Sequence, residues 1–354
     1  MMKKVVAPPS PRWFRQRILS WYDQHGRQDL PWKTPITPYG VWVSEIMLQQ
    51  TQVSTVIDYY QKFMRRFPDV SKLARAKQDT VLSYWAGLGY YARARNLHST
   101  AKIIHQEYNA QFPQSLAELM ALPGIGRSTA GAILAQAFDK KATILDGNVK
   151  RVLARVLCLD APKNDKQHID DLWAWSERWT PTKRVADYTQ AMMDLGATLC
   201  TRSRPRCPDC PVIQKCAAKQ NHREHEIPRR SKKSARPTKQ ITFLGVICQN
   251  KILLQKRPNT GIWGGLYSLP EYTDDKTIEQ WLGDNFNPDA LLTKTQVKRH
   301  SFTHYHLDYQ TYFVCCNHEP EIKENESWFS LDKLGKVGLP APIKKELLAY
   351  AQQL

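Results

Sequence analysis

Two carboxyl groups stand in contrasting sequence surroundings and could share acid–base chemistry. Glu45 is the only charged residue in the apolar run of residues 41–48, and burial raises the pKa of a carboxyl because it disfavours the charged form. Asp146 lies ahead of a predicted helix over residues 149–157, where free amides and the helix dipole favour an ionised carboxylate. A protonated acid beside an ionised carboxylate is the pairing that cleaves glycosidic bonds. The local sequence also allows a structural Glu paired with a basic residue and an ordinary capping Asp.

Four cysteines could bind a metal, because they lie within seventeen residues with the spacing Cys200-x6-Cys207-x2-Cys210-x5-Cys216. Clustered cysteines in a cytosolic chain indicate metal or cluster ligands rather than disulfides. A zinc ribbon normally has two Cys-x-x-Cys pairs and this chain has one, whereas iron–sulfur clusters accept more varied spacing. The spacing favours an iron–sulfur cluster and leaves zinc, or no metal, as alternatives. The remaining cysteines stand in apolar contexts that predict inert thiols, at Cys158, Cys248, Cys315 and Cys316.

A glycine turn and an arginine-rich loop are candidate contacts for phosphate. Gly124 and Gly126 lie between two helical stretches, and the amides at the start of the next helix can hold a phosphate without reading sequence. This pattern predicts a helix–hairpin–helix motif over about residues 115–138. Positive charge also lies on the cysteine loop, at Arg202, Arg204 and Arg206. These arginines suit phosphate contacts, although a merely solvated basic loop would have the same composition.

Charge and composition limit the classes of function. The chain has 354 residues, a formal net charge of +18 and a pI near 9.5, which favours a polyanionic partner such as nucleic acid. Hydrophobic residues make up 42%, too many for intrinsic disorder, and no apolar run reaches the roughly 18–20 residues of a membrane span. The start of the chain lacks the apolar core of a secretory signal. We therefore expect a cytoplasmic protein (in a bacterial-type cytosol or nucleoid) without membrane contact. We also expect a monomer.

Helical periodicity runs from residue 12 to residue 199. One amphipathic helix is indicated by apolar residues at helical spacing, namely Val53, Val56, Ile57, Tyr60, Phe63, Met64 and Phe67. The same spacing predicts helices around Phe14 and Ile18 and around Val152 and Leu153. No convincing strand pattern interrupts this stretch, which predicts an all-α domain.

The composition changes at residues 227–240, which have six basic residues, two prolines and almost nothing apolar. Such a segment is typical of an interdomain linker, and it predicts that few packing contacts cross it. Beyond it, strands are predicted at 241–248, 252–254 and 309–315, and helices at 278–282 and 342–352. The second domain is therefore predicted to be α+β. The resulting limits are a tail at 1–11, a helical domain at 12–199, the cysteine loop at 200–226, the linker at 227–240 and the α+β domain at 241–354.

Together these motifs resemble the helix–hairpin–helix DNA glycosylases that carry an iron–sulfur cluster. Three further segments, residues 42–52, 87–96 and 190–197, are similar to adenine DNA glycosylases of the MutY type, and the similarity runs from about residue 21 to residue 347. It implies a base excision repair enzyme that binds duplex DNA and flips adenine out of a mispair with 8-oxoguanine or guanine. The enzyme would then hydrolyse the N-glycosidic bond. The resemblance also implies a [4Fe–4S] cluster on the cysteine loop.

The resemblance assigns roles to individual residues. It implies that Glu45 is the general acid that protonates adenine N7, that Asp146 stabilises the oxocarbenium ion or traps it covalently, and that Asn148 supports this site. Further implied contacts are an adenine pocket at Trp32 and Gln190, a DNA wedge at Gln50 and Tyr90, a phosphate-binding hairpin at Leu122, Gly124, Gly126 and Ser128, 8-oxoguanine recognition at Phe302, Thr303 and His304, and metal ligands at Cys200, Cys207, Cys210 and Cys216.

Three positions refine this expectation. Ser128 stands where bifunctional relatives carry a lysine that attacks the sugar, which implies a monofunctional glycosylase with at most weak strand cleavage through a lysine such as Lys150. The second domain resembles a Nudix fold, but no Arg-Glu-x-x-Glu-Glu run for Mg²⁺ follows residues 264–271. We therefore expect it to bind rather than hydrolyse. Thr303 replaces the serine of the family's Phe-Ser-His loop and keeps the hydroxyl.

Alternative functions from other classes have different requirements. A pyrimidine glycosylase–lyase of the endonuclease III type would need the lysine that Ser128 replaces. A non-catalytic iron–sulfur regulator that binds DNA would need neither the Glu45–Asp146 pair nor a second domain. A nucleotide hydrolase would need the missing Mg²⁺ carboxylates.

Overall fold

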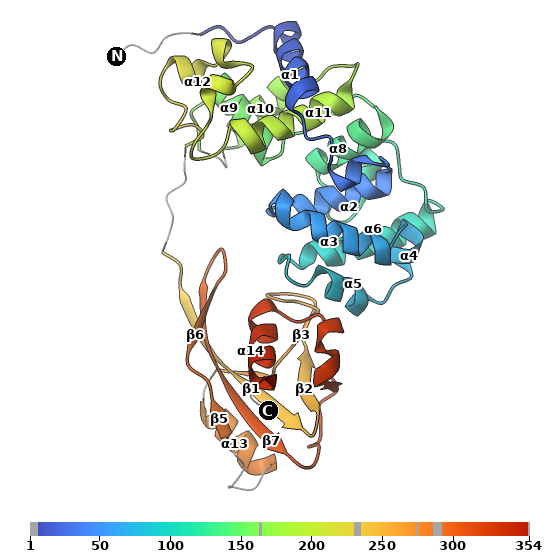
Figure 1. The fold of residues 1–354 in the computed structure, drawn as a ribbon, viewed down its shortest axis with the longest axis vertical. Helices are drawn as coiled ribbons and strands as arrows, with labels where there is room; N and C mark the ends of the chain where they lie inside the picture. The colour runs from blue at the N-terminus through green and yellow to red at the C-terminus, as the bar shows by residue number, and fades with distance from the viewer. Residues whose placement is uncertain (1–5, 163–164, 230–234, 274, 286–291, 353–354) are drawn as a thin grey trace. The chain divides into compact units, whose positions relative to one another are not determined.

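The computed structural model of the protein describes residues 6–162, 165–229, 235–273, 275–285 and 292–352 (Figure 1). The chain divides into two compact units, which are described separately. The first unit is Met1–Ala74 with Ser99–Lys233, and the second unit is Arg75–His98 with Ser234–Leu354. Residues 1–5 of the predicted tail and 230–234 of the predicted linker lie outside the described residues. The domain limits given above stay a prediction.

The first unit is built from helices. In chain order they are α1 (Pro11–His25), η1 (Pro31–Lys33), α2 (Pro38–Leu48), α3 (Val53–Arg66), α4 (Val70–Ala74), α7 (Leu116–Ala121), α8 (Arg127–Phe138), α9 (Gly147–Val156), α10 (Lys166–Trp179), α11 (Val185–Asp194), the single π turn η2 (Leu195–Leu199), η3 (Cys207–Asp209), η4 (Ile213–Lys215) and α12 (Ala217–Gln220). The described residues of this unit form no strand, only one isolated bridge between Pro162 and Arg229. The predicted all-α class is confirmed for this part of the chain.

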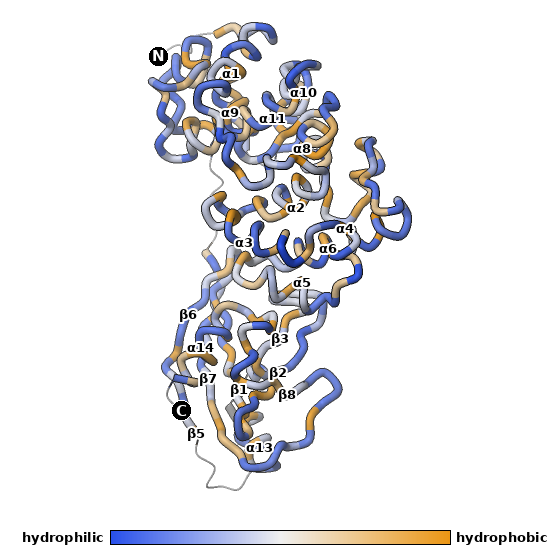
Figure 2. The backbone as a smooth tube through the Cα atoms, turned by 45° about the vertical axis from the view of Figure 1, so that its right-hand side comes forward, coloured by the Kyte–Doolittle hydropathy of each residue, from blue (hydrophilic) through white to orange (hydrophobic). Residues whose placement is uncertain are grey.

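Local sequence explains why these helices begin and pack where they do. Side-chain oxygens of Thr37, Asp146 and Asp165 accept hydrogen bonds from backbone amides in the first turns of α2, α9 and α10. The predicted amphipathic helix is α3, which ends at Arg66 and buries one apolar face. In Figure 2 the middle of α8 is apolar, and residues 129–135 there are buried.

The second unit combines helices with an eight-stranded mixed sheet. Its elements are α5 (Gln78–Trp85), the start of α6 (Ala92–Glu107, which ends in the first unit), β1 (Thr238–Cys248), β2 (Lys251–Lys256), β3 (Tyr267–Ser268), β4 (Glu271–Tyr272), α13 (Asp275–Asn285), β5 (Leu292–Lys294), β6 (Lys298–Ser301), β7 (His306–Cys316), β8 (Glu326–Ser330), η5 (Leu331–Lys336) and α14 (Ala341–Ala351). β1 and β2 form the predicted hairpin, whereas β1 and β7 run parallel along their full lengths. The α+β prediction is confirmed.

Residues 75–98 pack with the chain beyond the linker, although helical residues surround them in the sequence. The ammonium group of Lys256 pairs with the carboxylate of Asp79. Arg95 Nη1 donates to the carbonyl oxygen of Gly264 at 2.6 Å. The expectation that few packing contacts cross the linker is therefore wrong for this segment. The partners are more than 160 residues apart in sequence, a separation that local composition cannot reveal.

No helix in the described parts of the chain is long and apolar enough to cross a bilayer.

Candidate active site and metal centre

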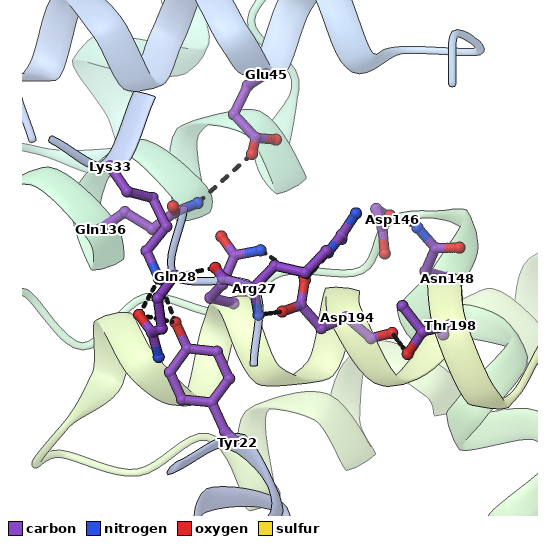
Figure 3. Close-up of polar contacts among 12 residues, drawn as sticks. Tyr22, Arg27, Gln28, Lys33, Glu45, Gln136, Asp146, Asn148, Asp194 and Thr198 are labelled. Atoms are coloured by element: carbon purple, nitrogen blue, oxygen red, sulfur yellow. Dashed lines mark hydrogen bonds and ion pairs between the residues drawn. The ribbon is translucent and has the colours of Figure 1, made fainter. Parts of the chain in front are cut away.

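Glu45 lies on α2, an otherwise apolar helix. Its side chain is half-buried among residues that are nearly all buried. Gln136 Nε2 of α8 donates to Glu45 Oε1 at 3.5 Å, as Figure 3 shows. Burial, with a smaller contribution from the nearby carboxyl of Asp146, raises the pKa of Glu45 from 4.5 to about 7. The raised pKa agrees with the sequence prediction, and the hydrogen-bond partner is an amide rather than a basic side chain. The role of Glu45 as an acid stays a prediction.

Asp146 caps α9, as the sequence predicts. Its Oδ1 accepts from Val149 N at 2.8 Å and its Oδ2 accepts from Asn148 Nδ2 at 3.1 Å. These hydrogen bonds lower the pKa, but burial outweighs them and raises the pKa above its usual 3.8. The expected hydrogen bonds from the helix N-terminus are present and favour the ionised form. The expectation is wrong for the net pKa shift, which is upward. Burial depends on how the whole chain packs, so the local pattern does not contain it.

Asn148 is held from its far side by Arg151. Arg151 Nη2 donates to Asn148 Oδ1 at 2.8 Å and to the carbonyl oxygen of Gly196 at 2.7 Å, and its Nε donates to that of Cys200 at 2.7 Å. A Cβ built on Gly196 would lie 2.5 Å from Asn148 Cβ, so this approach requires glycine. Sequence reasoning missed Arg151, and noted Gly196 only as part of the segment 190–197.

An ion pair with a buried carboxylate joins Arg27 to Asp194, the last residue of α11. Arg27 Nη2 lies 2.6 Å from Asp194 Oδ1, and the side chain of Asp194 is only 1% exposed. Gln190 Nε2 donates to the same oxygen at 2.8 Å. Thr198 Oγ1 donates to the backbone oxygen of Asp194 (Figure 3). Because Arg27 and Asp194 are 167 residues apart, sequence reasoning had no signal for the pair.

The two residues expected to line an adenine pocket are both buried. Trp32 is 3% exposed and meets the ring of Tyr60 edge-on, with centroids 5.5 Å apart. Gln190 is 4% exposed and is oriented by Asp194. Their contact with adenine stays a prediction.

The glycine turn forms the predicted helix–hairpin–helix. Ser115 is the N-cap of α7, and Gly124 has φ 78° in the turn. Gly126 is the N-cap of α8 and is exposed. Leu122 is buried and anchors the turn. Ser128 Oγ accepts from Leu145 N at 3.0 Å, so its hydroxyl holds the segment that leads into Asp146.

The expected wedge residues lie in different units. Gln50 has φ 59° and is exposed after the end of α2. Tyr90 has φ 50° and is 43% exposed before α6. Left-handed backbone is uncommon for residues other than glycine, so each side chain is displayed by an unusual local conformation.

The four clustered cysteines line one cavity. Its walls also include apolar side chains such as Val152, Leu195 and Leu199. Burial raises the pKa of Cys210 to about 12 and that of Cys216 to about 11, so a bound cation is needed for both to be thiolates at neutral pH. Four cysteines around one cavity are a donor set that suits a metal group. As the described side chains stand, no three His, Cys, Asp or Glu lie close enough together to hold a single ion, and metal binding stays a prediction.

Two basic features surround this centre. Arg155 Nη1 donates to Cys200 Sγ at 3.3 Å and to the carbonyl oxygen of Thr201 at 2.7 Å. Arg202, Arg204 and Arg206 are all exposed on the same loop. Their position fits phosphate contacts, which stay a prediction.

The residues expected to recognise 8-oxoguanine form the turn between β6 and β7. The strands end in the pair Ser301–His306. Within the turn, Phe302 is half-buried while Thr303 and His304 are exposed, and Thr303 Oγ1 lies 3.4 Å from His304 Nδ1. The turn therefore presents a hydroxyl and an imidazole to solvent.

Two protein-family models match separate parts of the chain. Residues 43–178 match the HhH-GPD superfamily of base excision DNA repair proteins, and residues 242–349 match the NUDIX domain. The helical family model thus covers both proposed catalytic carboxyls, and the NUDIX model covers the β6–β7 turn.

Curated relatives cover nearly the whole chain. An adenine DNA glycosylase of Buchnera aphidicola (subsp. Baizongia pistaciae) is 40% identical over 94% of this chain and 95% of its own length. The adenine DNA glycosylase of Mus musculus is 32% identical over 95% of this chain and 78% of its own length.

Solved structures resemble the helical part. A thermostable thymine-DNA glycosylase is 25% identical with a TM-score of 0.54, covering 59% of this chain and 96% of that one. Endonuclease III in a non-covalent complex with DNA is 20% identical with a TM-score of 0.52, covering 60% and 95%. The similarity to endonuclease III shows that the helical part of this chain has the same fold.

Proposed function

The chain belongs to the adenine DNA glycosylase family of base excision repair enzymes, and we propose that it removes adenine mispaired with 8-oxoguanine or guanine in duplex DNA. The observation that carries this proposal is the pair of interacting carboxyls. Glu45 has a pKa of about 7, and Asp146 is held at the start of α9.

In the proposed reaction, Glu45 is the general acid. Adenine is a poor leaving group until it is protonated, and a carboxyl with a pKa near 7 is a suitable donor to N7 at neutral pH. Gln136 donates to Glu45 Oε1, which orients the carboxyl. General acid catalysis of this kind typically contributes about 10²–10⁴-fold in rate.

Asp146 is the proposed stabiliser of the sugar cation. As the N-glycosidic bond breaks, positive charge develops on the deoxyribose, and a fixed carboxylate stabilises it without reorganisation. The hydrogen bonds from Val149 and Asn148 hold both oxygens of Asp146 in place. Asn148 is thus a positioning residue.

Access to the bond requires that adenine leaves the base stack. Gln50 and Tyr90 are the proposed wedge residues, and Trp32 and Gln190 the proposed adenine pocket. The exposure and backbone conformation of Gln50 and Tyr90 support their role. The helix–hairpin–helix turn and the arginines of the cysteine loop are proposed to bind phosphates.

The proposed cofactor is a [4Fe–4S] cluster held by Cys200, Cys207, Cys210 and Cys216. The common cavity and the membership in a family related to endonuclease III support it. When bound, the cluster supplies a structural centre that shapes the arginine-bearing loop. We further propose a monomer that works in a bacterial cytosol.

The enzyme is proposed to be monofunctional. Ser128 supplies no amine, and its hydroxyl is engaged by Leu145 N. Borohydride trapping with an A:8-oxoguanine duplex tests this point. A high yield of covalent adduct would instead indicate a lyase of the endonuclease III type.

Adenine release under single-turnover conditions tests the proposed function directly. The wild-type protein should release adenine from A:8-oxoguanine and A:G duplexes. Glu45→Gln should bind the same duplexes but release adenine at less than about a tenth of the wild-type rate, because an amide cannot protonate N7. Glu107→Gln removes an exposed carboxyl at the end of α6 and serves as the matched control. A wild-type protein that binds these duplexes but releases no base would support a non-catalytic regulator.

A further inference from the structure

The second unit displays two groups that come from distant parts of the sequence. Tyr90 lies in the segment 75–98, exposed and with a left-handed backbone. The recognition turn, defined as residues 302–304, joins β6 to β7. The proposed function assigns both groups to DNA bases. Contacts that hold Tyr90 and the recognition turn at a constant separation within this unit would therefore influence which base opposite adenine, 8-oxoguanine or guanine, the protein prefers.

The loop between β2 and β3 packs against the recognition turn. We define this coupling loop as residues 257–266. Trp263 is buried in it, with its ring centroid 5.4 Å from that of Phe302 and 5.9 Å from that of His300. The guanidinium carbon of Arg257 lies 5.8 Å from the Trp263 ring. Phe302 thus packs against a large side chain that is itself only 8% exposed.

The same loop is fastened to the segment that bears Tyr90. Arg95 Nη1 donates to the carbonyl oxygen of Gly264, next to Trp263, at 2.6 Å. Gln78 Nε2 donates to Asn259 Oδ1 at 3.1 Å. A hydrogen bond from a charged guanidinium is about twice as strong as a neutral one, so Arg95 is the firmer of the two attachments.

Tyr90 is in turn held close to Arg95. The backbone nitrogen of Arg93 donates to Tyr90 O at 2.9 Å, and that of Arg95 donates to Tyr91 O at 3.1 Å, so these bonds form the first turn of α6. The guanidinium of Arg93 also lies 5.6 Å from the Tyr90 ring and 5.3 Å from the Trp85 ring. A continuous set of contacts therefore runs from Tyr90 through Arg95 and the coupling loop to Phe302.

We propose that Trp263 and Arg95 are positioning residues that hold Tyr90 and the recognition turn in one arrangement, and that the preference for 8-oxoguanine over guanine opposite adenine depends on them. This inference rests on the proposed function. It extends that function, because neither residue has to touch DNA and the selectivity belongs to the arrangement rather than to the recognition turn alone.

The test compares adenine release from A:8-oxoguanine and A:G duplexes at single turnover in the full-length protein. Trp263→Ala and Arg95→Met should each lower the ratio of the two rates by about fivefold or more. The rate on A:G should stay within about twofold of wild type, because the carboxyl pair is untouched. Trp263→Phe should restore most of the ratio, since it returns an aromatic ring against Phe302. Arg95→Met tests the proposal independently if Trp263→Ala does not fold.

A double variant shows whether Trp263 acts through Phe302. If it does, Trp263→Ala combined with Phe302→Ala should have the same ratio as Phe302→Ala alone, because contacting residues are not additive. Additive losses would overturn this route. Trp328→Ala, which removes an indole packed on a core cluster that includes no residue of the coupling loop, is the matched control and should keep the wild-type ratio.

The outcomes separate this inference from the proposed function. A wild-type protein that releases adenine, together with unchanged ratios in Trp263→Ala and Arg95→Met, would overturn the positioning role alone. A comparable loss of ratio in Trp328→Ala would overturn it too, because general destabilisation would then explain the effect. A wild-type protein that releases no adenine from either duplex would overturn the proposed function itself.

Discussion

Arg151 and Asn148 are joined by a 2.8 Å hydrogen bond, and Asn148 in turn donates to Asp146. The guanidinium of Arg151 also binds the carbonyl oxygens of Gly196 and Cys200. One side chain therefore connects the residue that orients a proposed catalytic carboxylate with the backbone of a proposed metal ligand.

Arg151→Met should break this connection. We expect single-turnover adenine release to fall by about 10–100-fold, the usual effect of removing a supporting contact behind a reactive group. Arg12→Met also removes one positive charge, from an exposed position on α1, and should leave the rate within about twofold. An Arg151→Met rate equal to that of Arg12→Met would contradict the role of the network.

The pH dependence of the reaction should follow Glu45. Its carboxyl must be protonated to act as an acid, and its pKa is about 7. The rate of adenine release should therefore be highest below that pH and should decrease by about tenfold per unit above it. Glu45→Gln should show a low rate without this decrease. A wild-type rate that stays constant to about pH 9 would exclude Glu45 as the acid.

The raised pKa of Glu45 also predicts how the free energy of unfolding depends on pH. Because the folded-state pKa lies above the usual 4.5, the folded protein binds this proton more tightly than the unfolded chain. The free energy of unfolding should decrease as pH rises from 4.5 to about 7, by up to about 3 kcal/mol. Urea unfolding at pH 5 and pH 8 measures the decrease. Glu45→Gln removes this contribution, so at pH 8 the variant should be the more stable protein, and a less stable variant would refute the assignment.

Cys207→Ala should lose the metal centre. We expect a protein without brown colour, with little iron and sulfide by elemental analysis, and with weaker duplex binding, because Arg202, Arg204 and Arg206 lie on the same loop. Cys315→Ala removes an exposed cysteine of β7 and should keep all three properties. Stoichiometric zinc in the wild-type protein would refute the iron–sulfur assignment.

Truncation after Glu226 should loosen the segment 75–98. It removes Lys256 and Gly264, the partners of Asp79 and Arg95, and uncovers Leu82, which is now 1% exposed. Limited proteolysis should cut faster within this segment than in the full-length protein, and the preference for 8-oxoguanine over guanine should disappear. Equal protection in both proteins would show that the segment folds without the C-terminal chain.

The sequence by itself was sufficient for features that depend on short-range pattern. An isolated charge in an apolar helix marked Glu45, a capping position marked Asp146, and two glycines marked the turn between α7 and α8. The hairpin of β1 and β2 was equally visible, since alternating apolar residues and a short turn define it. These features follow from the periodicity of helices and strands, which a few neighbouring residues contain.

The tertiary structure alone decided which environment each of these residues has. The amide partner of Glu45 comes from a residue 91 positions away, and burial in the folded protein reverses the net pKa shift expected for Asp146. The ion pair of Arg27 with Asp194 and the attachment of Arg95 to Gly264 likewise join residues more than 160 positions apart. Burial and pairing are set by whichever segments pack together, and that information is spread over the whole chain instead of lying beside the residue concerned.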